Sequence, residues 1–144
     1  ADADGHLTAV LHGALRPLLG PALRLVLAHL PDDAPPPVPD GVEVAPWDPL
    51  GKEAAPLEAE LVLTLGLTPR RPAGETLAAA LRGATAPGGA LLLAEPAPGP
   101  FWDLTQGLDR GWWDRPRLAA AEDWSAALSR AGWQGCRALP VPPL

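Results

Sequence analysis

The chain has 144 residues, about one domain's worth, and a chain of this size can bury roughly two-thirds of its unfolded surface. Hydrophobic residues make up 47% and charged residues 19%, and no apolar run approaches the roughly 18 residues that spanning a bilayer requires. The formal charge of −6, from 11 Lys and Arg against 17 Asp and Glu, argues against binding to nucleic acid or anionic lipid. The single cysteine, Cys136, excludes an internal disulfide and a thiolate metal cluster.

The N-terminal segment carries acidic residues before its apolar part, unlike a secretory signal, so we expect a cytoplasmic protein. The 20 prolines and 15 glycines bring the composition close to that of disordered chains. Six tryptophans and several leucine-rich segments favour a packed body instead. We therefore predict an ordered domain with proline-rich loops.

In the first third of the chain, the apolar spacing over residues 5–19 predicts an amphipathic helix, which Pro17 should end or kink in its last turn. The short apolar run Leu23–Leu30 lies between two prolines and predicts a strand. The proline-rich residues 31–41 that follow predict a loop. Val42–Val44 alternates in polarity, which predicts a brief second strand.

The rest of the chain alternates strands and helices. The consecutive apolar residues of Ala59–Gly66 are typical of parallel strands buried on both faces. Together with the segments that follow, they predict a strand–helix–turn–strand unit of the parallel crossover kind. The expected elements after the first strand are a helix at Gly74–Gly83, a turn at Pro87–Gly89, a strand at Ala90–Glu95, helices at Phe101–Trp113 and Leu118–Ala131, a left-handed cap at Gly132 and a final strand at Trp133–Leu139.

The motifs of common catalytic and cofactor sites are missing. The segment after the first strand has no Gly-x-Gly, and its prolines lack the amide donors that a nucleotide-binding turn uses. Glu43 is the nearby acid that could hold a ribose, but it lies inside the second strand rather than after it. No P-loop, nucleophile elbow or His-x-x-x-His pair is present. The sequence thus predicts no catalytic, cofactor-binding or metal residues and no bound cofactor.

Five single residues deserve separate consideration. His6 and His12 are expected to face solvent, and His29, at the end of the first strand, is expected to be structural rather than part of a cleft. Cys136 is expected to be a buried, inert thiol in the final strand. Glu95 is the most interesting acid, because the carboxyl ends of parallel strands are where such folds keep their sites.

The tryptophans and arginines of the C-terminal half allow two interpretations. The tryptophans at 102, 112, 113, 124 and 133 favour a core or docking face over a ligand-stacking site. Three arginines, Arg110, Arg115 and Arg117, either pair with Asp109 and Asp114 or pack on the indoles. A phosphopantetheine-binding patch is the functional alternative for this cluster.

Several segments together resemble a known family. They are AELVLTLG from Ala59, ETLAAALRGATAPGGALLLAEP from Glu75, FWDLTQGLDRGWW from Phe101 and AEDWSAALSRAGW from Ala121. From Glu60 onward the chain resembles the C-terminal half of the C-methyltransferase domains of modular polyketide synthases, and of the inactive pseudo-methyltransferase domain of animal fatty acid synthase. WDPL, starting at Trp47, is a fainter match. The resemblance implies an α/β fold, a truncated Rossmann-like, class I methyltransferase-like and mostly parallel sheet flanked by helices, with an antiparallel last strand.

The chain departs from active members of this family in two places. Active members have a glycine-rich loop that holds S-adenosylmethionine, and nothing like it stands upstream here. They also place a histidine after the strand that matches Leu61–Leu65, acting with a glutamate where Glu95 lies. Thr68 or Pro69 occupies the neighbourhood of that histidine. Loss of the cofactor contacts should remove most of the roughly 7–8 kcal/mol behind micromolar binding.

The resemblance and these departures lead to one principal hypothesis. We expect residues 1–139 to form a single pseudo-methyltransferase domain, with a divergent part at 1–45 and a methyltransferase-like part at 46–139, followed by a linker at 140–144. Its expected role is non-catalytic, spacing or docking neighbouring ketoreductase, dehydratase or ketosynthase domains of a polyketide synthase. The alternatives are an active S-adenosylmethionine-dependent C-methyltransferase acting on carrier-protein-bound β-ketoacyl intermediates with Glu95 as base, and a module that binds acyl carrier protein.

Overall fold

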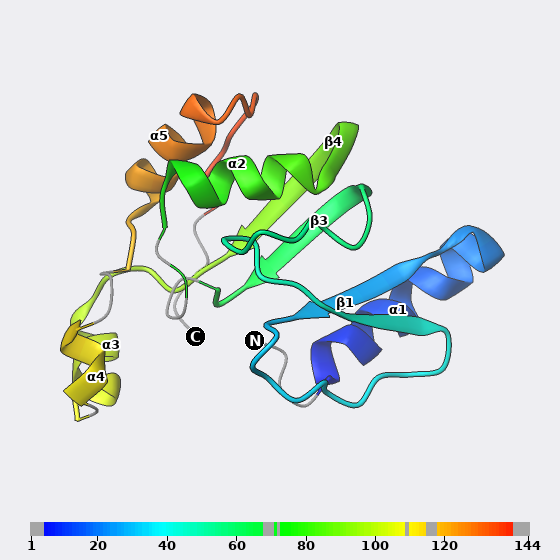
Figure 1. Cartoon of the computed structure of the whole chain (residues 1–144), viewed down its shortest axis with the longest axis horizontal. Helices are drawn as coiled ribbons and strands as arrows, with labels where there is room; N and C mark the ends of the chain where they lie inside the picture. Colours follow the sequence, from blue (N-terminus) through cyan, green and yellow to red (C-terminus); the bar gives the residue numbers. More distant parts are fainter. Residues whose placement is uncertain (1–4, 68–70, 72, 109, 115–117, 140–144) are drawn as a thin grey trace. The chain divides into compact units, whose positions relative to one another are not determined.

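The computed structural model describes residues 5–67, 71, 73–108, 110–114 and 118–139. The chain divides into two compact units, Ala1–Leu57 and Glu58–Leu144, and each holds one parallel pair of strands (Figure 1). In chain order the elements are α1 (His6–Leu19), the 3-10 helix η1 (Gly20–Ala22), β1 (Leu25–His29), β2 (Val42–Pro46), β3 (Ala59–Leu65), α2 (Glu75–Gly83), β4 (Thr85–Ala94), α3 (Pro100–Gln106), α4 (Arg110–Asp114) and α5 (Ala121–Arg130).

The first unit pairs β1 with β2 in parallel, from Leu25 opposite Val42 to His29 opposite Pro46. Both strands and the helix before them were expected from the sequence. Helix α1 ends at Leu19, two residues after Pro17, which agrees with the predicted end in its last turn. The apolar stripe of α1 is only partly covered, because Val10, Leu18 and Leu19 are all more than half exposed.

The second unit is built around β3, α2 and β4. The strands pair in parallel from Leu61 opposite Ala90 to Leu65 opposite Ala94, and α2 packs against β4. The buried side chains Leu77 and Leu81 of α2 form the centre of the core, which α5 completes with Trp124. Trp124 Nε1 is fully buried, and the described residues offer it no hydrogen-bond acceptor.

The prediction that the first strand of this unit is buried on both faces was wrong. Leu61 of β3 is 57% exposed and Leu92 of β4 is 48% exposed. Since side chains alternate between the two faces of a strand, these residues lie on the face opposite to that covered by α2. Helix α2 therefore covers one face of this sheet, and α5 packs on α2.

The predicted turn at Pro87–Gly89 is instead an irregularity within β4. Ala59 pairs with Thr85, but Leu61 pairs with Ala90, so the register shifts between these positions. A side chain at Gly89 would meet the Glu60 carbonyl oxygen at 2.8 Å and Thr85 Cγ2 at 2.9 Å. The extra residues bulge out of the ladder, and only glycine allows the two strands to approach this closely.

The predicted left-handed cap after α5 is confirmed. Gly132 has φ of +86°, and its amide donates to the Ser129 carbonyl oxygen at 3.1 Å. The Trp133 amide donates to the Leu128 carbonyl oxygen at 3.0 Å, which completes a Schellman motif.

The predicted final strand at Trp133–Leu139 was wrong, because none of these residues lies in a strand. Two features turn the segment away from an extended path. Gly135 takes a positive φ of +68°, and the Trp133 indole is held against α2 by a hydrogen bond from Nε1 to the Ala78 carbonyl oxygen at 3.1 Å. The expected antiparallel last strand is therefore absent from the described residues.

The chain is an α/β protein of parallel strands flanked by helices, as the sequence predicts. Its described strands form two small sheets of two strands each, rather than one larger sheet. None of the described helices is long and apolar enough to cross a membrane. The predicted domain limits at 1–139 stay a prediction, and the linker expected at 140–144 lies outside the described residues.

Candidate functional site at the ends of β3 and β4

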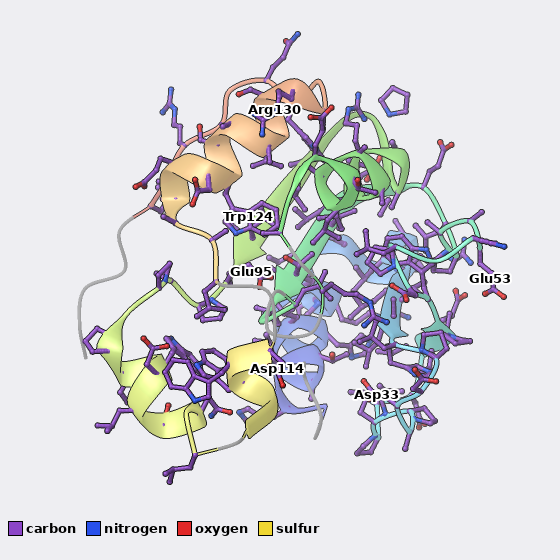
Figure 2. The ribbon with its side chains drawn as sticks, turned by 60° about the vertical axis from the view of Figure 1, so that its left-hand side comes forward. Asp33, Glu53, Glu95, Asp114, Trp124 and Arg130 are labelled. Atoms are coloured by element: carbon purple, nitrogen blue, oxygen red, sulfur yellow. The ribbon has the colours of Figure 1, made fainter. Side chains whose placement is uncertain are left out.

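Glu95 lies where the sequence places it, directly after β4 and at the carboxyl end of the parallel pair. Thr64, in β3, donates a hydrogen bond from Oγ1 to Glu95 Oε1 at 2.9 Å. Thr64 is buried and Glu95 is half-buried. Figure 2 labels Glu95 beside the strands of the second unit. Thr64 was not predicted from the sequence, although a hydroxyl group within the otherwise apolar run Leu61–Leu65 could have indicated it.

This arrangement fixes the direction of one carboxylate at the edge where α/β folds bind ligands. A half-buried carboxylate can accept a proton or a hydrogen bond from a ligand, and the bond from Thr64 limits its rotation. Thr68 and Pro69, the positions near which the sequence resemblance would place a histidine, lie outside the described residues. The geometry therefore supplies an acid that Thr64 orients.

The connection between β1 and β2 follows the first strand, where Rossmann-type folds hold a nucleotide cofactor. Residues 30–41 contain no helix, so no helix N-terminus is offered to a ligand there. Five of these residues are prolines, at 31, 35, 36, 37 and 39, and none of them carries an amide donor. Gly41 is the single glycine of the connection. These residues do not fit a nucleotide-like cofactor.

Glu43, the candidate ribose ligand, is engaged by an arginine instead. Arg24 Nε lies 2.7 Å from Glu43 Oε1 and Arg24 Nη2 lies 2.9 Å from Glu43 Oε2, so both carboxylate oxygens accept hydrogen bonds. The hydrogen bond from Arg24 lowers the pKa of Glu43, and the same bond raises the pKa of Arg24. Both side chains are more than half exposed, which indicates a surface ion pair rather than a ligand site.

The histidines form no catalytic arrangement among the described residues. His29 lies at the end of β1, and its Nδ1 is 3.0 Å from the Leu30 carbonyl oxygen, a local contact consistent with the predicted structural role. His6 is exposed as predicted, and it borders a shallow hollow of about 420 Å³ between the start of α1 and Pro37–Pro39. His12 is half-buried, so it faces solvent only in part.

The prediction for Cys136 was wrong, because this residue is exposed and outside any strand. The loss of the final strand is the reason, since no sheet covers the thiol. The described residues contain no group of three or more His, Cys, Asp or Glu that could hold a metal ion.

The tryptophans divide between the core and the surface. Trp124 is buried, Trp102, Trp112 and Trp133 are half-buried, and Trp113 is 63% exposed. The Arg82 guanidinium carbon lies 5.4 Å from the centre of the Trp133 ring, a cation–π contact. The side chains of Asp109, Arg110, Arg115 and Arg117 lie outside the described part of the chain, so the predicted arginine and indole contacts of this cluster stay predictions.

A solved structure has a fold similar to that of this chain. The chain is similar to a crystal structure described as the S-adenosylmethionine-dependent methyltransferase SibL in its apo form, with a TM-score of 0.63 and 17% sequence identity. The chain has a methyltransferase-like fold. The match covers 99% of this chain but 45% of the other, so the chain spans less than half the length of that protein. No protein-family model and no curated protein matches the sequence.

Proposed function

We propose that this chain is a non-catalytic, methyltransferase-like domain of a multidomain polyketide synthase, where it spaces and docks neighbouring domains. The methyltransferase-like fold supports the general class. The segments from Glu60 onward that resemble polyketide synthase C-methyltransferase domains support the biosynthetic context. The neighbours would be ketoreductase, dehydratase or ketosynthase domains of the same cytoplasmic polypeptide.

The observation that carries the non-catalytic assignment is the connection between β1 and β2. Rossmann-type folds hold dinucleotides with backbone amides of a glycine-rich turn and a helix N-terminus, and active members of the resembled family have a glycine-rich loop that holds S-adenosylmethionine. Here five prolines remove amide donors, and residues 30–41 contain no helix. Glu43, the remaining candidate for the ribose, has both carboxylate oxygens bonded to Arg24.

Calorimetric titration with S-adenosylmethionine and with its demethylated product, up to millimolar concentration, tests this function. We expect no saturable heat, with an active methyltransferase titrated in parallel as the positive control. Equilibrium dialysis with labelled cofactor guards against binding whose enthalpy is near zero. Saturable micromolar binding in either experiment would overturn the non-catalytic assignment.

The Thr64–Glu95 hydrogen bond favours one alternative, an active C-methyltransferase that acts on a carrier-protein-bound β-ketoacyl substrate. In this function Glu95 would remove the proton from the carbon between the two carbonyl groups of the substrate, and S-adenosylmethionine would supply the methyl group. Glu95 is the proposed general base because it follows the carboxyl end of β4, where α/β folds bind ligands, and accepts a hydrogen bond from Thr64.

Transfer of labelled methyl to a β-ketoacyl thioester, measured by scintillation counting, tests the alternative. If it holds, Glu95→Gln should lower the transfer by about 10²-fold or more, since a positioned general base contributes roughly 10²–10⁴-fold. Glu60→Gln, which changes an exposed glutamate of β3, is the matched control and should leave transfer unchanged. No transfer by the unmodified chain would dismiss this alternative.

A further inference from the structure

The connection between β1 and β2 contains the run Ala-Pro-Pro-Pro-Val-Pro at residues 34–39. Each proline fixes its own φ at about −65°, and each residue that precedes a proline is held in an extended conformation. The peptide bonds of this segment are trans, and the segment contains no helix or strand. These restraints are typical of polyproline II, a left-handed helix with three residues per turn and no internal hydrogen bonds.

Burial along the connection repeats with the period of that helix. The residues of one row are half-buried, namely Asp33, Pro36 and Pro39, and those of the next row are exposed, namely Ala34, Pro37 and Asp40. Pro35, which begins the third row of the segment, is exposed as well. We call Ala34, Pro35 and Pro37 the proline ridge. The ridge is one continuous surface, because its members lie in neighbouring rows of a single stretch of backbone.

The opposite side of the segment is held in place by the first unit. The Pro37 carbonyl oxygen lies so close to Gly5, directly before α1, that a side chain at Gly5 would overlap it. Gly5 also takes a positive φ of +69°, which favours glycine. At the end of the segment, the Val42 amide donates to the Pro39 carbonyl oxygen at 3.2 Å. The ridge is therefore presented on a fixed backbone, which reduces the conformational entropy lost when a partner binds.

The composition of the segment determines the chemistry of a partner. Prolines in polyproline II conformation dock into grooves that are lined with aromatic side chains. The three prolines at 35–37 have no N–H group, so their backbone only accepts hydrogen bonds. Asp32 and Asp40 are exposed and lie at the two ends of the segment. Lysine or arginine side chains at the ends of the groove would complement these two acids.

The charge of the chain argues against a second copy as the partner. The formal charge of −6 makes two copies repel each other, and it disfavours nucleic acid and anionic lipid in the same way. We infer that the proline ridge docks into an aromatic groove with basic ends on another protein domain. This inference goes beyond the proposed function and does not depend on it, because the ridge can be bound whether or not the chain is catalytic.

Titration of an isotopically labelled WW domain with the whole chain, followed by the amide NMR signals of the domain, tests the inference. The probe is a WW domain with lysine or arginine at the rim of its aromatic groove. We expect saturable shifts of the groove signals with a dissociation constant below about 1 mM. The same domain with its groove tryptophan replaced by alanine is the control and should not bind. Replacing the basic rim by glutamate should weaken binding about tenfold or more.

Substitutions in the chain locate the contact. Pro35→Ala combined with Pro37→Ala removes two exposed proline rings and should weaken binding about tenfold or more. Pro56→Ala combined with Pro98→Ala changes two exposed prolines outside the segment and should leave binding unchanged. Far-UV circular dichroism checks that both variants are folded.

A charge reversal tests the ends of the ridge while keeping its prolines. Asp32→Lys combined with Asp40→Lys should reverse the preference, so that the domain with the glutamate rim binds more tightly than the domain with the basic rim. An unchanged preference would overturn the inference, as would shifts outside the groove, no saturable binding by the unmodified chain, or equal binding by the two proline variants. Sedimentation of the chain alone tests for a second copy. A dimer that is lost in the Pro35 and Pro37 variant would assign the ridge to self-association instead.

Discussion

Helix α5 and the α3–α4 hairpin are both tryptophan-bearing elements of the second unit, yet they use this residue in opposite ways. Trp124 of α5 is 8% exposed, and α5 is held to α2 by packing and by an ion pair between Arg130 and Glu75 at 3.1 Å. Trp113 of α4 is 63% exposed and bonds within its own hairpin. Trp124 therefore contributes to the stability of the whole unit because α2 covers it, whereas Trp113 contributes only within the hairpin.

Truncation of Trp124 gives the largest expected loss of stability. Trp124→Ala removes a buried indole from the core around Leu77 and should lower the free energy of unfolding by about 3–5 kcal/mol. Urea unfolding followed by far-UV circular dichroism measures the loss without relying on tryptophan fluorescence. Trp113→Ala is the matched control and should stay within about 0.5 kcal/mol of the unmodified chain. Equal losses for the two variants would contradict the division between α5 and the hairpin.

A second substitution of Trp124 tests whether its buried indole N–H lacks a hydrogen-bond acceptor, again by urea unfolding. Trp124→Phe keeps an aromatic ring but removes a buried donor that has no acceptor among the described residues. Leaving such a group buried costs about 1–3 kcal/mol, which offsets part of the cavity that the smaller ring creates. We therefore expect Trp124→Phe to cost clearly less than Trp124→Ala. A loss as large as that of Trp124→Ala would show that Nε1 has a partner in solution.

Substitutions at Gly89 and Gly107 should destabilise different parts of the second unit, the strand pair in one case and the α3–α4 hairpin in the other. Gly89→Ala introduces a methyl group against the Glu60 carbonyl oxygen and should destabilise the second unit by about 1–3 kcal/mol, measured by urea unfolding. Gly107→Ala introduces a similar clash with Asp103 but within the hairpin. It should raise amide hydrogen exchange over residues 100–114 while leaving the exchange of β3 and β4 unchanged. Exchange that rises throughout the second unit would show that the hairpin is part of the core.

Thr64 and Thr105 provide a smaller comparison between a buried and an exposed hydroxyl. Thr64→Val removes the bond to Glu95 and should lower the free energy of unfolding by about 0.5–1.5 kcal/mol, while Thr64→Ser retains it. Thr105 donates to the Phe101 carbonyl oxygen at 2.8 Å on the exposed face of α3, where water can replace the bond. Thr105→Val should change the midpoint of urea unfolding less than Thr64→Val. The opposite order would contradict the burial assigned to Thr64.

The sequence predicts most of this fold because its local signals are strong. The apolar runs of β1, β3 and β4, the spacing of α2 and α5 and the left-handed cap at Gly132 all follow from chemistry within a few residues. The prediction of the final strand was wrong because a strand needs a neighbouring strand to pair with. Trp133 donates a hydrogen bond to the Ala78 carbonyl oxygen of α2 instead. The exposure of Cys136 followed from that failure.

The candidate site was half predictable for a similar reason. Glu95 directly follows an apolar run that predicts a strand, so its position at a strand end can be predicted from that segment alone. The bond from Thr64 depends on the register between two strands that are distant in the sequence, which periodicity does not specify. The ion pair between Arg24 and Glu43 depends on register in the same way, since Leu25 pairs with Val42.

The ion pair between Arg24 and Glu43 belongs to the first unit and is exposed. Removing it should have the smallest effect of the changes considered. The hydrogen bond from Arg24 lowers the pKa of Glu43, so the folded state favours the ionised carboxylate. The stabilisation is present above the pKa of Glu43 in the unfolded chain and disappears as the pH falls through the lowered pKa of the folded state.

Arg24→Gln should raise the pKa of Glu43 toward its ordinary value. Carbon-detected NMR of the side-chain carboxyl group measures this pKa. Arg16→Gln, which changes an arginine in the last turn of α1, is the control and should leave that pKa unchanged. Because both partners are exposed, 1 M salt should weaken the shift, whereas a salt-independent shift would indicate a buried pair and would place Glu43 in a site rather than on the surface.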